Sequence, residues 1–136
     1  MKKLRIRPIV EGKVEGEAIV SPVSISFLGG VDSETATIID QDNPLFGESI
    51  ANKIFIFPDS KGSTVGSYVI YGLRVNNVAP AAFITNHAEP IVVAGAILAD
   101  IILVDKPDED FIRSIKNGDI ISIDTNEKYL TIIKKD

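Results

Sequence analysis

A change of hydrophobic period near the middle of the chain constrains the fold more than any other feature. Residues 53–57 (Lys-Ile-Phe-Ile-Phe) are rich in β-branched and aromatic side chains, as a buried strand is, and Pro58 ends that strand. Beyond a short loop, residues 65–73 carry apolar side chains three and four positions apart, which is the spacing of one helix face. The chain is therefore expected to pass from a strand into a helix over about residues 62–77.

Short strands account for most of the other predicted elements. The predicted strands cover residues 3–8, 17–20, 37–39, 53–57, 80–84, 101–104, 120–123 and 129–133, and the last two form a hairpin. A second helix is predicted over 91–98, a helical turn over 111–115 and a loop over 21–33. No clean Rossmann alternation of strands and helices is expected. The predicted fold class is α+β, with a β-heavy core that forms a closed or nearly closed sheet.

The size of the chain predicts a single domain over residues 1–136. Chains of this length usually fold around one core, and 45% of the residues are apolar. The net charge is −5, because 19 Asp and Glu residues exceed 14 Lys and Arg residues. Since nucleic-acid backbones bind cationic surfaces, we expect no nucleic acid as a partner.

Residue types that the sequence lacks exclude several kinds of site. Without cysteine, the chain can form no disulfide, thiol nucleophile or cysteine-ligated iron–sulfur cluster. His87 is the single histidine, so a site of several histidines is excluded and no metal is expected on this chain. The longest apolar stretch, residues 90–99, is short of the roughly 20 residues that a membrane span needs, and no signal peptide is recognisable. We expect a cytoplasmic protein that does not bind membranes.

Residues 59–67 (Asp-Ser-Lys-Gly-Ser-Thr-Val-Gly-Ser) join the predicted strand to the predicted helix and form the strongest candidate site. A tight turn there would direct backbone N–H groups and the positive end of the helix dipole at one point. Anions bind at such points, and a hydroxyl ionises more easily there. Lys61 adds a positive charge, and Ser63 and Ser67 are predicted to lie one helical turn apart on the same face.

Established motifs do not describe this segment. The spacing from Gly62 to Gly66 is one residue short of a Walker loop, and the serine directly follows the glycine, unlike the serine of a nucleophile elbow. On the residues alone, Ser63 is either a functional hydroxyl or a helix N-cap that contributes about 1 kcal/mol. A Ser–His–Asp set made of Ser63, His87 and Asp59 also stays open.

Three further segments contain candidate residues. The pair Gly29-Gly30 is either a turn or a place where a ligand or partner can approach the backbone closely. His87 is either a proton carrier or an ordinary surface side chain, and Glu89 either faces a shared cleft or starts a helix. Residues 105–110 are predicted to be a solvated, charged loop.

Several of these segments occur in an order that resembles a known family. They are residues 26–32 (Ser-Phe-Leu-Gly-Gly-Val-Asp), 47–49 (Gly-Glu-Ser), 57–58 (Phe-Pro), 61–68 (Lys-Gly-Ser-Thr-Val-Gly-Ser-Tyr) and 79–80 (Ala-Pro). The chain resembles the swivel-domain small subunits of the aconitase X family, in particular its archaeal branch that dehydrates phosphomevalonate. The resemblance extends from about Gly12 to Asp105, and the Lys-Gly-Ser-x-x-Gly-Ser block is its most specific part.

This resemblance implies one half of a two-subunit enzyme. The fold would be the swivelling β/β/α domain of the aconitases, with a barrel-like β core and flanking helices. A separate large subunit would carry a 4Fe-4S iron–sulfur cluster on its own cysteines, so this chain would be active only in the heterodimer. The substrate would be a small phosphorylated hydroxy acid, (R)-5-phosphomevalonate, dehydrated to trans-anhydromevalonate 5-phosphate in the archaeal mevalonate route to isoprenoids.

The resemblance also implies roles for the candidate residues. Ser63 matches the catalytic serine that acts as the proton acceptor. The residues that bind substrate or shape its pocket would be Lys61, Gly62, Ser67, Gly29 and Gly30. The two adjacent glycines would belong to a cleft or a subunit-interface loop, and the free subunit is expected to expose an apolar or glycine-rich face around residues 27–31.

One departure from the family pattern concerns substrate binding. In ordinary aconitase-type swivel domains an arginine follows the catalytic serine, whereas Thr64 follows Ser63 here. Arg74 is about three turns into the predicted helix and is expected to be too far away to replace that arginine. Two alternative functions stay open: another aconitase X dehydratase such as a hydroxyproline dehydratase, and a non-catalytic binding module with the same fold.

Overall fold

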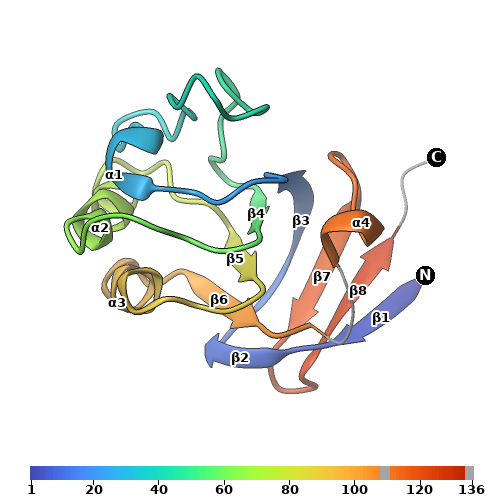
Figure 1. Ribbon diagram of the computed structural model, residues 1–136. Coiled ribbons are helices and arrows are strands. Elements are labelled where there is room, and N and C mark those ends of the chain that lie inside the picture. The colour runs from blue at the N-terminus through green and yellow to red at the C-terminus, as the bar shows by residue number, and fades with distance from the viewer. Residues whose placement is uncertain (108–110, 134–136) are drawn as a thin grey trace.

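The computed structural model describes residues 1–107 and 111–133, which form one mixed, eight-stranded sheet with helices packed against it (Figure 1). The strands are β1 (Lys2–Arg5), β2 (Arg7–Val10), β3 (Lys13–Val20), β4 (Ile54–Phe57), β5 (Ala82–Thr85), β6 (Ile102–Asp105), β7 (Ile120–Asp124) and β8 (Tyr129–Ile133). The helices are α1 (Phe27–Gly30), α2 (Gly66–Val75), α3 (Pro90–Ala99) and α4 (Phe111–Ser114). Within this part of the chain, no helix has the length and apolar character needed to cross a membrane.

The first ten residues almost close the sheet into a ring. The strand order is β1-β8-β7-β3-β4-β5-β6-β2, so β1 and β2 lie at opposite edges although only Ile6 separates them. The Ile6 side chain is buried, and its backbone N–H donates to the Lys128 carbonyl at 3.0 Å. The nearly closed, barrel-like sheet with few flanking helices confirms the predicted fold class. The single predicted strand over residues 3–8 is wrong, because this segment divides between two edges.

A short alternation of strands and helices occupies the centre of the chain. Strands β4, β5 and β6 are parallel neighbours, and β3 pairs parallel with β4. Helices α2 and α3 are the crossover connections, and both lie on the same side of these strands (Figure 1). The expectation that no clean Rossmann alternation occurs holds for the whole sheet, which is mixed, although β4-α2-β5-α3-β6 alternates locally.

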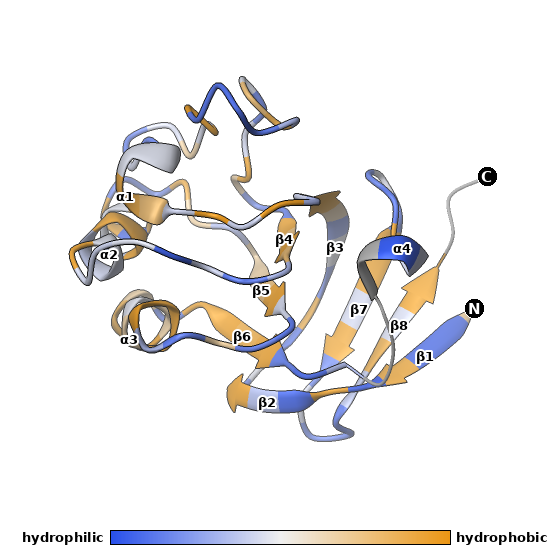
Figure 2. Ribbon diagram, in the orientation of Figure 1, coloured by the Kyte–Doolittle hydropathy of each residue, from blue (hydrophilic) through white to orange (hydrophobic). Residues whose placement is uncertain are grey.

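Side chains of these central strands fill two cores. Ile54 and Ile56 of β4 point into the inside of the sheet, whereas Phe55 and Phe57 point toward the helices. Since both faces are covered, all four side chains are fully buried and the strand is a continuous apolar run. Figure 2 shows the same concentration of hydrophobic residues in β4, β5 and β6.

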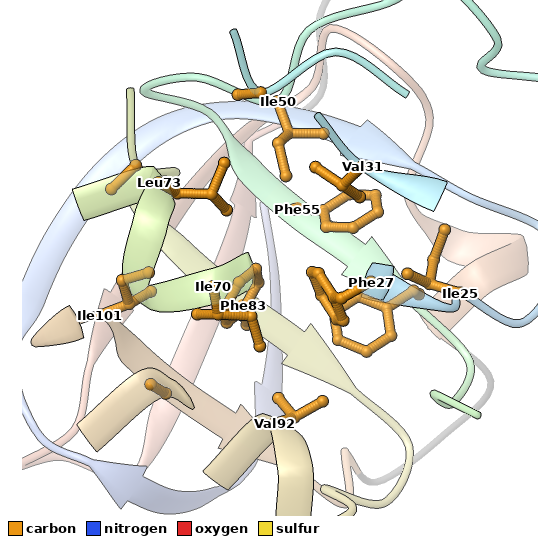
Figure 3. Close-up of a cluster of buried hydrophobic side chains, with 14 of the residues drawn as sticks. Ile25, Phe27, Val31, Ile50, Phe55, Ile70, Leu73, Phe83, Val92 and Ile101 are labelled. Atoms are coloured by element: carbon orange, nitrogen blue, oxygen red, sulfur yellow. The ribbon is translucent and has the colours of Figure 1, made fainter. Parts of the chain in front are cut away.

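The core beneath the helices contains a cluster of four phenylalanines. Phe27 lies 5.6 to 6.5 Å, centroid to centroid, from the rings of Phe55, Phe57 and Phe83, mostly in edge-to-face geometry. Figure 3 shows Phe27 in this cluster with Phe55 and Phe83. The strands provide three of these rings, but Phe27 comes from α1. The cluster therefore fixes the position of the segment that follows β3.

Several predicted elements are confirmed and others change. The structure confirms strand β4, helix α3, the helical turn α4 and the β7–β8 hairpin. Residues 37–39 form only isolated bridges, and the predicted loop over 21–33 contains α1. That helix is irregular, because Gly29 has a φ of +84°. Helix α2 begins at Gly66, about four residues later than predicted.

Candidate functional site

The candidate site lies at the carboxyl ends of β4 and β5. The Thr85 hydroxyl and the Asn86 backbone N–H both donate to the Pro58 carbonyl, at 3.0 and 3.1 Å. These bonds hold the loop after β4, residues 58–65, beside the loop after β5, residues 86–89. The carboxyl edge of parallel strands is where α/β sheets usually bind ligands.

Residues 24–26 brace the loop after β4 from its other side. The Ile25 N–H donates to the Asp59 carbonyl at 3.0 Å, and the Lys61 N–H donates to the Ile25 carbonyl at 2.9 Å. The Ser24 hydroxyl also donates to the Asp59 carboxylate. Two segments that the family resemblance singled out, 26–32 and 61–68, are thereby brought together in space.

Gly62 has a backbone conformation that would be strained for any other residue. Its φ is +103°, which L side chains rarely adopt, and a Cβ there would lie 2.7 Å from the Ser26 Oγ. Gly62 therefore shapes this turn by its backbone conformation and by allowing Ser26 to approach.

Ser63 is exposed, and it is not the N-cap of α2. The N-cap position belongs to Val65, which makes no side-chain cap bond. The Ser63 Oγ instead accepts a hydrogen bond from the Val65 N–H at 3.1 Å, in a turn before the helix. The N-cap interpretation is therefore wrong. Because Ser63 precedes the helix, it does not share a helix face with Ser67, whose hydroxyl donates to the Thr64 carbonyl at 2.9 Å.

Three consecutive amides around Ser63 are available to a ligand. Across residues 1–107 and 111–133, the backbone N–H groups of Gly62, Ser63 and Thr64 donate to no acceptor. The Lys61 side chain is exposed beside them. Adjacent free N–H groups next to an ammonium attract negative charge and stabilise an oxyanion that develops there.

A shallow pocket of about 260 Å³ opens next to this loop. Its lining residues are Ser60, Lys61, Gly62, Thr64, Glu89, Pro90 and Ile91. Glu89 stands just before α3, and its carboxylate makes no cap bond to that helix. Both interpretations of Glu89 therefore apply, because it occupies the N-cap position of α3 and also lines the pocket beside the Lys61–Gly62 turn. Ser63 lies between two of the lining residues but does not itself line the pocket.

The other predicted site residues lie away from this pocket. Gly29 is exposed, whereas Gly30 is buried and its carbonyl accepts the Ile39 N–H at 2.9 Å. Within residues 27–31, the expected exposed face consists of Leu28 and Gly29 alone. Phe27, Gly30 and Val31 are buried. Neither glycine lines the pocket, so a role in contacting a partner stays a prediction.

No Ser–His–Asp set forms in the described part of the chain. His87 is exposed and makes no hydrogen bond to Ser63 or Asp59 there. The Asp59 carboxylate instead accepts a hydrogen bond from the Ser24 hydroxyl. Arg74 is also distant, as predicted. Its guanidinium donates to the Ala99 and Asp100 carbonyls, at 2.7 and 3.1 Å, and so binds the carboxyl end of α3.

Asp105 is a buried residue that the sequence analysis placed in a solvated loop, which is wrong. Its carboxylate is fully buried and accepts two 2.8 Å hydrogen bonds from the Arg7 guanidinium and one of 2.8 Å from the Ala88 N–H. Burial raises the pKa of Asp105, but these hydrogen bonds and the charges of Arg7 and Lys106 outweigh burial and lower it below its usual value. Asp105 therefore stays ionised and holds the loop that carries Glu89. Of that predicted charged loop, residues 108–110 lie outside the described residues.

The residues of this chain do not fit an iron–sulfur cluster. The sequence has no cysteine, and the described residues contain no group of three or more His, Asp or Glu side chains that could hold a metal ion. Cysteine thiolates are the usual ligands of such clusters. A cluster that serves this site would have to be bound by another chain.

Comparison with known proteins finds similarity over nearly the whole chain. The family model described as the aconitase X swivel domain matches residues 3–132. A phosphomevalonate dehydratase small subunit from Thermococcus kodakarensis is 49% identical over 132 residues, which cover 97% of each chain. One from Methanococcoides burtonii is 46% identical over 133 residues, covering 98% of this chain and 97% of the relative.

A solved structure agrees equally well. A chain in the crystal structure of Thermococcus kodakaraensis aconitase X in its holo form superposes with a TM-score of 0.93 and 48% sequence identity. The superposition covers 98% of this chain and 100% of that chain. Sequence, domain extent and three-dimensional structure therefore lead to one conclusion: the chain belongs to the aconitase X swivel-domain family.

Proposed function

We propose that this chain is the small subunit of a dehydratase that converts (R)-5-phosphomevalonate to trans-anhydromevalonate 5-phosphate. Near-full-length relatives that share almost half of its residues have the name phosphomevalonate dehydratase small subunit, and they come from archaea. The observation that carries the proposal is the turn around Ser63, where an exposed hydroxyl lies among free amides and beside Lys61.

The reaction removes a proton and a hydroxyl from neighbouring carbons. The base takes a proton from the carbon next to the carboxylate, and the electron pair of that C–H bond becomes the new double bond. The C–O bond at the adjacent carbon breaks, and the hydroxide leaves as water after it gains a proton. The first step needs a strong base, because a carboxylate activates its neighbouring C–H bond only weakly.

Ser63 is the residue that we assign as this base. A serine alkoxide is far too basic to persist in water at neutral pH, so its charge must be stabilised by its surroundings. The free N–H groups of Gly62 and Thr64, the positive end of α2 and the Lys61 ammonium supply that stabilisation. Ser67 supports the turn through its hydrogen bond to the Thr64 carbonyl.

The partner in this proposal is a large subunit that binds a 4Fe-4S cluster. The cluster would supply a Lewis acid for the departing hydroxyl, which this chain does not provide. In the heterodimer, the partner would close the open pocket beside Lys61 and Glu89. This arrangement explains why the small subunit is expected to be inactive alone.

The test is a dehydration assay on the assembled complex. The chain is co-expressed without oxygen together with its large subunit, and 5-phosphomevalonate turnover is measured for wild type, Ser63→Ala and Ser33→Ala. Ser33 is a matched control, since its carbonyl accepts a hydrogen bond from the Asn76 side chain at the carboxyl end of α2, away from the turn. We expect activity that needs both subunits, is lost in Ser63→Ala and is kept in Ser33→Ala. An active Ser63→Ala complex would show that Ser63 is not the base. An intact wild-type complex without turnover would refute the assignment of 5-phosphomevalonate as the substrate.

A further inference from the structure

The Ser60 hydroxyl is buried without a hydrogen-bond partner at the edge of the candidate site. Ser60 is 9% exposed, and its Oγ has no partner in the described structure. Ser60 also lines the pocket, beside Lys61, Gly62 and Thr64. It is the one buried side-chain oxygen or nitrogen without a partner among the residues that the structure describes.

This burial of Ser60 is unfavourable in the free chain. Burying a hydroxyl without a partner loses the hydrogen bonds it made to water, and nothing in the folded chain replaces them. Most buried polar side chains avoid that loss. Ser21, for example, is fully buried but donates to the Val23 carbonyl at 2.7 Å and accepts from Asn43 at 3.1 Å. An unsatisfied polar group beside a pocket is therefore a candidate for contact with a ligand.

The groups around Ser60 indicate which ligand chemistry fits. The free N–H groups of Gly62, Ser63 and Thr64 and the Lys61 ammonium all favour an anionic oxygen. Glu89 is the one lining carboxylate, and its charge opposes that of Lys61. The Ser60 hydroxyl is uncharged, so the hydrogen bond that it can donate to an anionic oxygen does not depend on the opposite charges of Lys61 and Glu89.

We propose that Ser60 is a ligand-contact residue whose hydroxyl donates to an oxyanion of the substrate, either a carboxylate or a phosphate. The backbone is already in place, because Ile25 and Ser60 are bridged and the flanking Asp59 and Lys61 are hydrogen-bonded to Ile25. A serine hydroxyl turns about a single bond, so Oγ reaches the pocket without a backbone change. The assignment deepens the proposed function and rests on it for the identity of the substrate.

Thermal unfolding of the free full chain provides the first measurement. Ser60→Ala removes a hydroxyl that has no partner, so we expect a Tm equal to or above that of wild type. Ser21→Ala is the matched control, since it removes a buried serine hydroxyl with partners, and it should lower the Tm by about 3 °C or more. A comparable loss of Tm in Ser60→Ala would mean that a fixed water or a protein group already satisfies this hydroxyl, and would overturn the proposal.

Activity of the assembled complex provides the second measurement. We expect Ser60→Ala to lower kcat/KM for 5-phosphomevalonate by about tenfold or more, because hydrogen bonds to charged oxygens are strong. Ser21→Ala should stay within about twofold of wild type. An unchanged kcat/KM in Ser60→Ala, with wild type active, would also overturn the proposal.

Anion titration of the free chain tests the role of Ser60 independently of which substrate the complex uses. Inorganic phosphate and acetate are added at constant ionic strength, and the amide resonances of residues 60–64 are followed by NMR. We expect one of the two anions to bind, and we expect Ser60→Ala to lower the affinity for that anion several-fold. The anion that binds identifies the group that contacts Ser60 as a phosphate or a carboxylate. If the wild-type complex does not dehydrate phosphomevalonate, the proposed function fails, but this titration still tests whether Ser60 contacts an anion. Equal affinity in both variants, or no binding, then refutes the role of Ser60.

Discussion

Arg7 and Asp105 face each other across the β2–β6 ladder and form a two-pronged ion pair, although they lie 98 residues apart in the sequence. The Asp105 carboxylate accepts a third hydrogen bond from the Ala88 N–H, in the loop that places Glu89 at the pocket. The pair therefore connects the edge strand that nearly closes the sheet to the candidate site. Half of the Arg7 side chain is exposed, while that of Asp105 is fully buried.

Acid should weaken the fold through Asp105. Because its pKa is lower in the folded chain than in the unfolded chain, the carboxylate stabilises the fold above the unfolded pKa, and this contribution is lost as the pH falls through the folded pKa. Asp105→Asn should cost about 1–3 kcal/mol of unfolding free energy at neutral pH. Urea unfolding from pH 7 to pH 3 measures the difference from wild type, which should shrink toward acid. Asp42→Asn, at an exposed carboxylate, is measured in parallel as the control for the loss of one negative charge.

Removing the cation should be more damaging than neutralising the anion. Arg7→Leu leaves the buried Asp105 carboxylate with the Ala88 N–H as its remaining hydrogen-bond donor. Leaving a buried charge unpaired costs about 3–5 kcal/mol. We expect urea unfolding at pH 7 to show a larger loss for Arg7→Leu than for Asp105→Asn. Equal losses would indicate that water reaches the carboxylate freely.

Gly62→Ala should damage both the fold and the turn around Ser63. The substitution combines a φ of +103° with a Cβ that would lie 2.7 Å from the Ser26 Oγ. We expect a cost of about 1–3 kcal/mol and a large loss of activity in the complex. Gly47→Ala isolates the backbone effect, since Gly47 has a φ of +87° but a Cβ there would meet no atom within 4 Å. A smaller loss of stability in Gly47→Ala, with activity kept, would confirm that the Ser26 contact matters.

Helix α3 packs closely against helix α2 at Gly95. A Cβ there would lie 2.7 Å from the Cδ1 and 2.8 Å from the Cβ of Ile70. Alanine normally stabilises a helix by about 1 kcal/mol relative to glycine, yet Gly95→Ala should destabilise by about 1–3 kcal/mol because the helices must separate. Gly16→Ala is the control, since its Cβ would make an ordinary contact of 3.4 Å with Ile54. A Tm for Gly95→Ala at or above wild type would contradict this packing.

Phe27 should stabilise the chain far more than its neighbour Leu28. Phe27 is fully buried among three other aromatic rings, whereas Leu28 is 46% exposed. Phe27→Ala should cost about 3–5 kcal/mol, and Leu28→Ala should stay within about 0.5 kcal/mol of wild type. Urea unfolding measures both. If Leu28→Ala has no effect on folding but weakens assembly with the large subunit, residue 28 contacts the partner.

Local patterns in the sequence predict the centre of the fold well. The apolar run over residues 53–57 corresponds to β4, because that strand buries all four of its side chains. The alanine-rich run over residues 91–98 corresponds to α3, which buries Val92, Ala96 and Ala99 against the core. The β7–β8 hairpin is also predicted, since its turn residues and its alternation are both local signals.

Long-range pairing explains where sequence prediction fails. Residues 3–8 alternate like one strand, but whether they form one strand or two depends on pairing partners far away in the sequence, from Leu103 to Ile132. The burial of Asp105 has the same origin, because its cation is in β2 and its second donor is in the loop before α3. A charged residue that directly follows an apolar strand such as Ile102–Val104 is the one local signal that could have indicated this pair.

The candidate site is predicted in part. Residues 59–67 and Glu89 meet because each follows a parallel strand, and the glycine and hydroxyl pattern marks the first of them. Ser60 gives no such signal, since an unpartnered hydroxyl is recognised only when burial and hydrogen bonds are known for every neighbour. The role of Ser63 as a base stays a prediction that the mutant assays test.

The split of the first ten residues between two edges has a consequence for synthesis on the ribosome. Strands β1 and β2 are made before every other described strand, yet β2 must wait for β6, some 98 residues later in the chain. At ordinary translation rates this delay is about 5–20 s. During that time an uncharged strand would be free to aggregate, and charged side chains are a known protection against this. Lys2, Lys3, Arg5 and Arg7 place such charges in an otherwise acidic protein on the segment that waits longest.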